Sequence, residues 1–279
     1  MKKRNLISLL LIGVLAATSL LGCGNSGNTA SNNSKSEQSS TASSDDLLTQ
    51  IKSSGTLKIG TEGTYAPYTY HNDKNELVGY DVEVGQAIAK ELGVKAEFVE
   101  TPWDSCIAGL DAKRYDVVMN QVGITDERKE KYDFSTPYTV TRAVLIVGKD
   151  NNDIKSFNDL KGKKAAQGLT SNFADMAKKY GADLVDTDGQ FSKSIDLIAS
   201  GRSDATINDD VAFYDYLKQK PDAPLKIADT LNEASNNAVL IRKGNDSFVK
   251  AVNDALAKLD KDGTLKNISE KYFGNDVTK

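Results

Sequence analysis

The sequence predicts an α/β protein built from two units of similar size. Strand and helix patterns alternate over residues 56–119, which is typical of a parallel sheet covered by helices. The alternation begins again after Thr141. Residues 110–117 and 198–205 also echo each other, because each combines a helix end, a basic turn and an aspartate that opens a strand.

The first unit has three predicted strands and two predicted helices. The strands cover residues 56–60, 94–99 and 115–119. The helices cover residues 81–92 and 104–114. Each helix begins at an aspartate, Asp81 or Asp104, which is expected to cap its first turn.

The second unit and the C-terminal region continue the alternation. Ser156 is expected to cap a helical turn over residues 157–160. Further strands are predicted over residues 143–147, 164–167, 183–186, 204–207, 225–228 and 238–242. Helices are predicted over residues 172–180, 192–199, 210–217, 246–259 and 265–272 as the alternation continues. In residues 246–259, apolar side chains recur at helical spacing.

The N-terminal segment is typical of a secretory signal peptide. Three basic residues at positions 2–4 precede a short apolar run over residues 6–21. This run is marginal for a membrane span, which needs about 20 mostly apolar residues.

The apolar run ends in Leu20-Leu21-Gly22-Cys23, which resembles the lipobox of bacterial lipoproteins. The resemblance implies that residues 1–22 are removed and that Cys23 is diacylated with palmitate-like chains. Residues 23–44 are rich in Gly, Asn, Ser and Thr and are predicted to form a disordered tether. The alternative is an ordinary signal peptide that contains a cysteine.

Composition excludes several classes of function. Without the three basic residues at positions 2–4, the chain has 32 basic and 39 acidic residues, a net charge of −7. An acidic chain with scattered charges argues against nucleic acid as a partner. One histidine, His71, and two cysteines argue against a zinc site, and Cys106 is left without a partner for an internal disulfide.

Several motifs follow one another along residues 47–279. They are Gly60-Thr-Glu-Gly-Thr-Tyr-Ala-Pro-Tyr68, Gly79-Tyr-Asp-Val-Glu83, Trp103-Asp104, Asp116-Val-Val-Met-Asn-Gln-Val-Gly-Ile-Thr-Asp-Glu-Arg128, Tyr132-Asp-Phe-Ser-Thr-Pro-Tyr138, Asp159-Leu-Lys-Gly-Lys163, Gly201-Arg-Ser-Asp-Ala205 and Asp262-Gly-Thr-Leu265. In this order and spacing they resemble the amino-acid-binding proteins of ABC importers, the polar-amino-acid branch of the periplasmic-type binding proteins.

The resemblance implies a periplasmic-binding-protein type II architecture, in which two Rossmann-like lobes joined by a two-segment hinge close around a ligand. Lobe one is then residues 45–138 with 238–279, and lobe two is residues 139–237. The resemblance also implies a monomer without enzyme activity or cofactor. Its partners are an amino acid, an ABC permease and its ATPase subunit, and it contacts the membrane only through the lipid on the extracytoplasmic side.

A bound amino acid needs a cation for its carboxylate and an anion for its ammonium, because burying either charge unpaired is costly. By the resemblance, Arg128 grips the carboxylate with its planar guanidinium. Thr170, Ser171 and Asn172 open a helix, whose first N–H groups favour an anion. Asp209 binds the ammonium, with Asp210 as the competing candidate.

The remaining site residues are also implied by the resemblance. Tyr65 and Trp103 match aromatic positions that sandwich the ligand. Gln121 and Gly123 match a loop that lines it, where glycine permits a close backbone approach. Glu62 matches an acidic position at the far end of the ligand.

Other stretches resemble the cystine-binding members in particular. They are Glu62-Gly-Thr-Tyr65, Asn120-Gln-Val122, Tyr132-Asp-Phe-Ser-Thr-Pro-Tyr138 and the ending Tyr272-Phe-Gly-Asn-Asp-Val-Thr-Lys279. Cystine has two amino-acid heads, and Glu62 is suited to the distal ammonium. No residue is indicated for the distal carboxylate.

Alternatives remain open from the sequence. Glu62 also suits arginine or lysine, and histidine or glutamine are further candidate ligands. A dehydratase-like enzyme and a ligand sensor are known uses of related folds. Cys106 has two interpretations, a small buried residue or a thiol that exchanges with a bound disulfide. The first is favoured, because exchange would trap a ligand that must be released.

Overall fold

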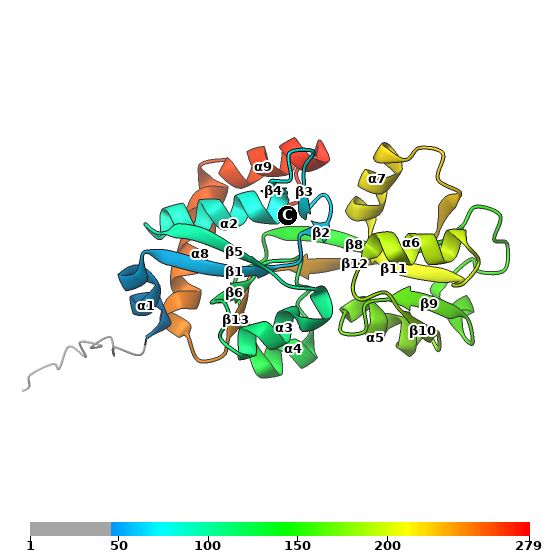
Figure 1. Ribbon diagram of the computed structural model, residues 1–279, viewed down its shortest axis with the longest axis horizontal. Helices are drawn as coiled ribbons and strands as arrows, with labels where there is room; N and C mark the ends of the chain where they lie inside the picture. Colours follow the sequence, from blue (N-terminus) through cyan, green and yellow to red (C-terminus); the bar gives the residue numbers. More distant parts are fainter. Residues whose placement is uncertain (1–45) are drawn as a thin grey trace, which may run out of the picture. The chain divides into compact units, whose positions relative to one another are not determined.

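The computed structural model describes residues 46–279. The predicted signal peptide, Cys23 and the predicted tether lie outside the described residues. Two five-stranded sheets organise the described part, and each is covered by helices (Figure 1). The α/β prediction is therefore confirmed.

The first sheet has the strand order β5-β1-β6-β13-β7. Strands β5, β1 and β6 are parallel, whereas β13 is antiparallel to both β6 and β7. The bounds are β1 Thr56–Thr61, β5 Lys95–Glu100, β6 Val117–Val118, β7 Tyr132–Phe134 and β13 Leu240–Arg242. A small antiparallel sheet, β2-β3-β4, stands beside it, with bounds Thr64–Tyr65, Thr69–His71 and Leu77–Val78.

Helices cover both faces of the first sheet. Their bounds are α1 Leu47–Ser54, α2 Tyr80–Glu91, α3 Trp103–Asp111, α4 Asp126–Lys131, α8 Asp246–Lys261 and α9 Thr264–Phe273. Val117 and Ile241 belong to the core shared with α1, α2, α8 and α9, whereas their neighbours Val118 and Leu240 belong to the core shared with α3. This alternation follows from the two-residue period of a strand. We call these elements, α1 to β7 with β13 to α9, lobe one.

The second sheet has the order β10-β9-β11-β8-β12. Its strands are β8 Thr139–Gly148, β9 Lys164–Gln167, β10 Asp183–Asp186, β11 Ala205–Asp209 and β12 Leu225–Asn237. The short helix η1 (Phe157–Leu160) and α5 (Asn172–Lys179) pack on one face, and α6 (Phe191–Ala199) and α7 (Asp210–Gln219) pack on the other. We call the elements from β8 to β12 lobe two.

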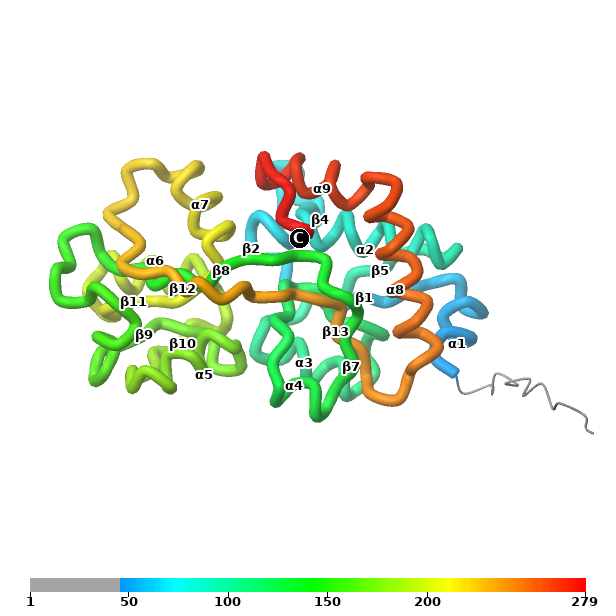
Figure 2. The backbone as a smooth tube through the Cα atoms, turned by 180° about the vertical axis from the view of Figure 1, so that it is seen from behind, coloured from blue at the N-terminus to red at the C-terminus, as the bar shows by residue number. Residues whose placement is uncertain are grey.

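Two long strands connect the lobes. Strand β8 follows β7 of the first sheet, and β12 precedes β13, so each leads from one sheet into the other. They pair antiparallel from Thr139 with Asn237 to Gly148 with Leu225, and Figure 2 shows them side by side between the lobes. The register shifts twice along β12. Asn237 also forms a bridge with Gly123, which ties the β6–α4 loop to this connection.

The sequence echo between the two units has a structural counterpart. Asp116 accepts a hydrogen bond from the backbone N–H of Lys58 on β1, at 2.9 Å. Asp204 accepts one from the backbone N–H of Lys164 on β9, at 2.7 Å. In both lobes, therefore, the aspartate before a central strand holds the first parallel neighbour of that strand in place.

Most predicted elements are present within a few residues of their expected ends, and Ser156 does cap η1. Two predicted caps are wrong. Pro102 and Gly79 occupy the N-cap positions of α3 and α2, so Asp104 and Asp81 lie inside the first turns. Each carboxylate instead accepts hydrogen bonds from a distant loop. Within residues 46–279, no helix has the length and apolar character required to span a bilayer.

Candidate ligand-binding site

A cavity lies between the lobes, at the carboxyl ends of parallel strands from both sheets. Glu62 follows β1, Asn120 follows β6, Gln167 ends β9 and Asp209 ends β11. Lobe one contributes Glu62, Tyr65, Trp103, Asn120 and Gln121, and lobe two contributes Gln167, Gly168, Ser171, Asn172, Phe173, Gly189, Phe191, Ser194, Asn208 and Asp209. Ligands of open α/β sheets bind at this edge.

Glu62 is a buried carboxylate in the wall of this cavity. Its Oε1 accepts a hydrogen bond from Thr64 Oγ1 at 3.0 Å, and its Oε2 accepts one from Asn120 Nδ2 at 2.9 Å. The backbone N–H of Glu62 donates in turn to Asn120 Oδ1 at 2.9 Å. No cationic side chain of residues 46–279 pairs with it. Burial raises the pKa of Glu62 to about 7.

Gln121 has an unusual backbone conformation. Its φ is +50°, in the left-handed region that side chains other than glycine rarely adopt. Asp81 holds it there, since its two carboxylate oxygens accept hydrogen bonds from Gln121 N at 2.8 Å and Gln121 Nε2 at 2.7 Å. The side-chain oxygen of Gln121 is buried without a partner. Asp81 thus positions a cavity residue instead of capping α2.

Asp209 is the buried carboxylate of lobe two. Its Oδ1 accepts a hydrogen bond from Thr141 Oγ1 at 2.5 Å, and its Oδ2 accepts one from Tyr65 OH at 3.2 Å. Tyr65 lies on lobe one, so this contact joins the lobes. Burial, together with the charge of Asp210, raises the pKa of Asp209 to about 7. Asp210 instead accepts hydrogen bonds from the backbone N–H groups of Arg142 and Val211 and does not line the cavity.

Arg128 lies in α4, which Thr125 caps, and borders a groove that adjoins the cavity. Its Nη1 donates to Gly123 O at 2.9 Å, and its guanidinium carbon lies 5.7 Å from the centre of the Trp103 ring. Desolvation lowers the pKa of Arg128. No carboxylate within residues 46–279 forms an ion pair with it. Its hydrogen-bond acceptors are neutral carbonyl groups, and the carboxylates of Asp175 and Glu127 only partly offset the desolvation of its charge.

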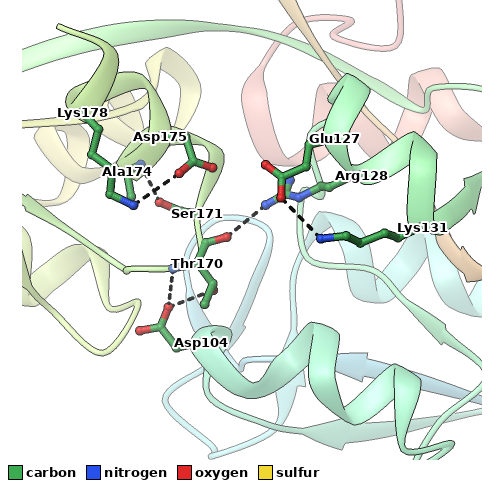
Figure 3. A network of polar contacts seen from close by, with 9 residues as sticks. All are labelled: Asp104, Glu127, Arg128, Lys131, Thr170, Ser171, Ala174, Asp175 and Lys178. Atoms are coloured by element: carbon green, nitrogen blue, oxygen red, sulfur yellow. Dashed lines mark hydrogen bonds and ion pairs between the residues drawn. The ribbon is translucent and has the colours of Figure 1, made fainter.

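Thr170 is held from lobe one by two charged side chains. Asp104 Oδ1 accepts hydrogen bonds from Thr170 N and Thr170 Oγ1, both at 2.9 Å, and Arg128 Nη2 donates to Thr170 O at 3.3 Å (Figure 3). Figure 3 shows Thr170 between these two side chains at the start of α5. We call the contact between Asp104 and Thr170 the latch. It explains why Asp104 is not a helix cap.

Ser171 and Asn172 begin α5 at the cavity. Ser171 Oγ accepts a hydrogen bond from Ala174 N at 3.0 Å, so it is the N-cap of this helix. Asn172 approaches Gly123 of lobe one so closely that a Cβ at Gly123 would lie 3.3 Å from Asn172 Nδ2. The first turn of α5 therefore lies against Gly123, whose carbonyl oxygen accepts the hydrogen bond from Arg128.

Trp103 packs against two glycines of lobe two. A Cβ at Gly189, whose φ is +83°, would lie 2.5 Å from Trp103 Cβ, and one at Gly168 would lie 3.3 Å from Trp103 Cδ1. Only glycine permits this approach of the backbone. The indole N–H of Trp103 is buried and has no acceptor.

Seven of the ten sequence-predicted binding residues line the cavity: Glu62, Tyr65, Trp103, Gln121, Ser171, Asn172 and Asp209. Gly123, Arg128 and Thr170 do not. Arg128 and Thr170 border the adjoining groove, which shares Asn172 with the cavity.

The sequence analysis did not assign eight other lining residues: Asn120, Gln167, Gly168, Phe173, Gly189, Phe191, Ser194 and Asn208. Asn120 and Asn208 follow or end predicted strands, so their place at the carboxyl end of a strand is a signal that could have found them. Phe191 and Ser194 carry no such signal, because they reach the cavity from the face of α6.

Cys106 lies in a setting that decides between its two interpretations. The Cys106 side chain is fully buried in the core beside Trp103, and burial raises the pKa of its thiol to about 12. Because the thiolate is the reactive form, the thiol is unreactive in this setting. Within residues 46–279, no cluster of three or more His, Cys, Asp or Glu side chains is arranged to hold a metal ion.

Comparison with known proteins identifies the family. The model of the bacterial extracellular solute-binding proteins, family 3, matches residues 57–275. The chain belongs to this family. The L-cystine-binding protein TcyA of Bacillus subtilis (strain 168) is 46% identical over 278 residues, which cover 99% of this chain and 100% of that protein.

Solved structures give the same fold and differ in how closely they superpose. An ancestral arginine-binding protein bound to arginine is 39% identical, with a TM-score of 0.74 over 79% of this chain and 99% of that one. The L-cystine solute receptor of Neisseria gonorrhoeae in its unliganded open conformation is 48% identical, yet its TM-score is 0.56 over 84% of this chain and 99% of that one. The better match to the ligand-bound structure agrees with the direct contacts between the lobes at Thr170 and Tyr65.

Proposed function

We propose that this family member is the extracytoplasmic substrate-binding component of an ABC amino-acid importer and that it captures L-cystine by lobe closure. Two results support the proposal, the match to family 3 and the near full-length similarity to a cystine-binding relative. Its partners are then the permease and the ATPase subunit. Cys23 carries a lipid that anchors a monomer to the outer face of the cell membrane.

The observation that carries the proposal is the charge pattern of the cleft. Arg128 has no carboxylate partner among residues 46–279, and Asp209, in the wall of the cavity, has no cationic one. Unpaired buried charges are costly. A zwitterion that reaches from one to the other supplies both missing partners.

Each end of the zwitterion has a complement. The carboxylate binds the Arg128 guanidinium and the free N–H groups in the first turn of α5, beside Ser171 and Asn172. The α-ammonium binds Asp209, while Tyr65 and Trp103 enclose the stem of the ligand. Glu62 takes a second ammonium, which cystine has and most amino acids lack.

Closure follows from contacts that need both lobes. Ligand docks first on lobe one, comprising residues 45–138 and 238–279, through Arg128, Tyr65 and Trp103. Lobe two, residues 139–237, then brings Asp209 and the first turn of α5 to the ligand. A ligand favours the closed form only through contacts that the open form lacks. The closed form is the one that docks on the permease, whose ATPase partner drives release.

The test is a thermal-shift panel on the purified protein, unfolded and refolded to remove carried-over ligand. Cystine, cysteine and the common amino acids are added separately. A ligand that binds only the folded state raises the melting temperature, by mass action. We expect the largest shift with L-cystine. A larger shift with arginine, lysine, histidine or glutamine would identify that amino acid, and not cystine, as the ligand. No shift with any compound of the panel would contradict amino-acid binding.

A further inference from the structure

A second pocket adjoins the cavity. Its lining includes Thr64, Glu100, Asp188 and Gln190, and it shares Glu62 and Trp103 with the cavity. We call it the side pocket. Because Glu62 and Trp103 border both spaces, these two side chains form the partition between them.

The side pocket has groups for a positive charge. Glu62 Oε1 is held by Thr64 at 3.0 Å and has no cationic partner among residues 46–279. Glu100 is paired with His71 at 3.3 Å, and Asp188 is paired with Lys193 at 2.6 Å. Glu62 is therefore the carboxylate of the side pocket that remains free to take an ammonium.

The side pocket also has groups for a negative charge. Helix α6 begins directly after Gln190, and no side chain caps its first turn. Lys193 lies in that first turn and reaches the rim of the side pocket through its ion pair with Asp188, a lining residue. The indole N–H of Trp103, a residue only 7% exposed, has no acceptor. Trp103 Cδ1, the atom next to this nitrogen, lies against Gly189, which comes just before α6. An unpaired buried donor beside an uncapped helix N-terminus suits an anionic group of a ligand.

The spacing suits a ligand with two amino-acid heads. The Cα atoms of a disulfide-linked cysteine pair are usually about 4.4–6.8 Å apart. Two heads so close together require adjoining spaces that share a wall, as the cavity and the side pocket do through Glu62 and Trp103.

We propose that the side pocket binds the second head of a disulfide-linked bis-amino acid. Glu62 takes the distal ammonium, and the distal carboxylate binds Trp103 Nε1, the first turn of α6 and Lys193. This inference rests on the proposed function and extends it, because it assigns the distal carboxylate, for which the sequence indicates no partner.

The experiment uses ligands that each lack one charged group. The mixed disulfide of cysteine with cysteamine has no distal carboxylate, and that of cysteine with 3-mercaptopropionate has no distal ammonium. Calorimetric titration of the refolded wild-type protein should show each binding about 10- to 100-fold more weakly than cystine, since each loses charge-assisted hydrogen bonds.

Two variants identify the partners by double-mutant cycles. Glu62→Gln should weaken cystine and the cysteamine disulfide but leave the mercaptopropionate disulfide unchanged. Lys193→Gln should weaken cystine and the mercaptopropionate disulfide but leave the cysteamine disulfide unchanged. The matched control is Lys250→Gln, whose exposed partner Asp254 lies at the same 2.6 Å distance, and it should change none of the three.

The outcomes separate the two proposals. Equal affinity for all three disulfides would overturn the side pocket as a binding site and leave the cystine function standing. Failure of the wild-type protein to bind any disulfide, with binding of another amino acid instead, would overturn the proposed cystine function itself.

Discussion

Charged side chains on the surface of this protein form ion pairs, whereas those in the cleft do not. Every ion pair within residues 46–279 involves a lysine or His71, and most of these partners are substantially exposed. In the cleft, Arg128, Asp209 and Glu62 have only neutral hydrogen-bonding partners. Exposed pairs contribute little to stability, whereas a buried unpaired charge is costly. We infer from this difference that the charges of the cleft pair with a bound molecule and not with other residues of the chain.

The largest expected loss of cystine affinity comes from removing the positive charge of Arg128. Arg128→Gln should weaken cystine binding by about 2–5 kcal/mol, because the ligand carboxylate would be buried without its charged partner. The cystine affinity of Arg128→Lys should lie between those of Arg128→Gln and the wild type, since lysine keeps the charge but not the planar pair of donors. Isothermal calorimetry measures both.

The matched surface change for Arg128 is Arg202→Gln. Arg202 is exposed and donates only to Ser200 Oγ, at 3.0 Å. The Arg202→Gln variant should bind cystine with the affinity of the wild type. Equal affinity for cystine in Arg128→Gln and Arg202→Gln would remove Arg128 from the site.

A second effect concerns closure and should be smaller. In Gly189→Ala the new Cβ would lie 2.5 Å from Trp103 Cβ, so lobe two cannot approach Trp103 as it does here. Overpacking costs about 1–3 kcal/mol, which corresponds to a roughly 5- to 150-fold loss of cystine affinity. Titration gives the affinity, and small-angle scattering with saturating cystine should show a more open molecule than the wild type.

Gly201→Ala controls for backbone strain in that comparison. Gly201 also has a positive φ, +69°, but a Cβ there would meet nothing within 4 Å. Both variants should lose stability, and only Gly189→Ala should lose cystine affinity. If the two variants bind equally well, the contact between Gly189 and Trp103 is irrelevant to closure.

The smallest expected loss of cystine affinity comes from breaking the latch, the contact between Asp104 and Thr170. Asp104→Asn removes the charge that accepts from Thr170 N and Thr170 Oγ1, so we expect about 3- to 10-fold weaker cystine binding. Thr170→Val in the same background should add little, because both changes act on one contact.

Asp254→Asn breaks a purely exposed pair, Lys250 with Asp254, and should leave the affinity unchanged. Two results would contradict a role for the latch in cystine binding. One is that the affinity losses from Asp104→Asn and Thr170→Val are additive, and the other is that Asp254→Asn also lowers the affinity.

The sequence predicted the alternation of strands and helices well, because apolar periodicity is local information. It failed where a polar side chain acts over a long distance in the chain. Asp81 and Asp104 have the right neighbours for helix caps, yet their carboxylates bind Gln121 and Thr170, 40 and 66 residues away. No local pattern distinguishes a cap from such a contact.

The candidate site shows the same division. The family motifs led to Glu62, Tyr65, Trp103 and Asp209, which do line one cavity. They did not reveal the positive φ of Gln121, because that conformation is imposed by Asp81 from another element. The lining residues on α6 were also beyond reach, because their position depends on how the lobes meet.

The charge contrast between surface and cleft is tested most directly by counting protons released when the refolded protein binds cystine. The pKa of Glu62 and that of Asp209 are both about 7, so both groups are largely protonated at pH 6 before cystine is added. An ammonium beside each carboxylate favours the ionised form and lowers its pKa. The raised pKa values of these two carboxyl groups stabilise the folded protein at low pH, and this contribution is lost as the pH rises through 7.

Calorimetric titration at pH 6, in buffers of different ionisation enthalpy, should therefore show a release of about one to two protons per cystine bound. Affinity should rise between pH 6 and pH 8 and then level off. No proton release, together with an affinity that does not change between pH 6 and pH 8, would mean that neither carboxylate meets an ammonium, and would contradict the proposed site.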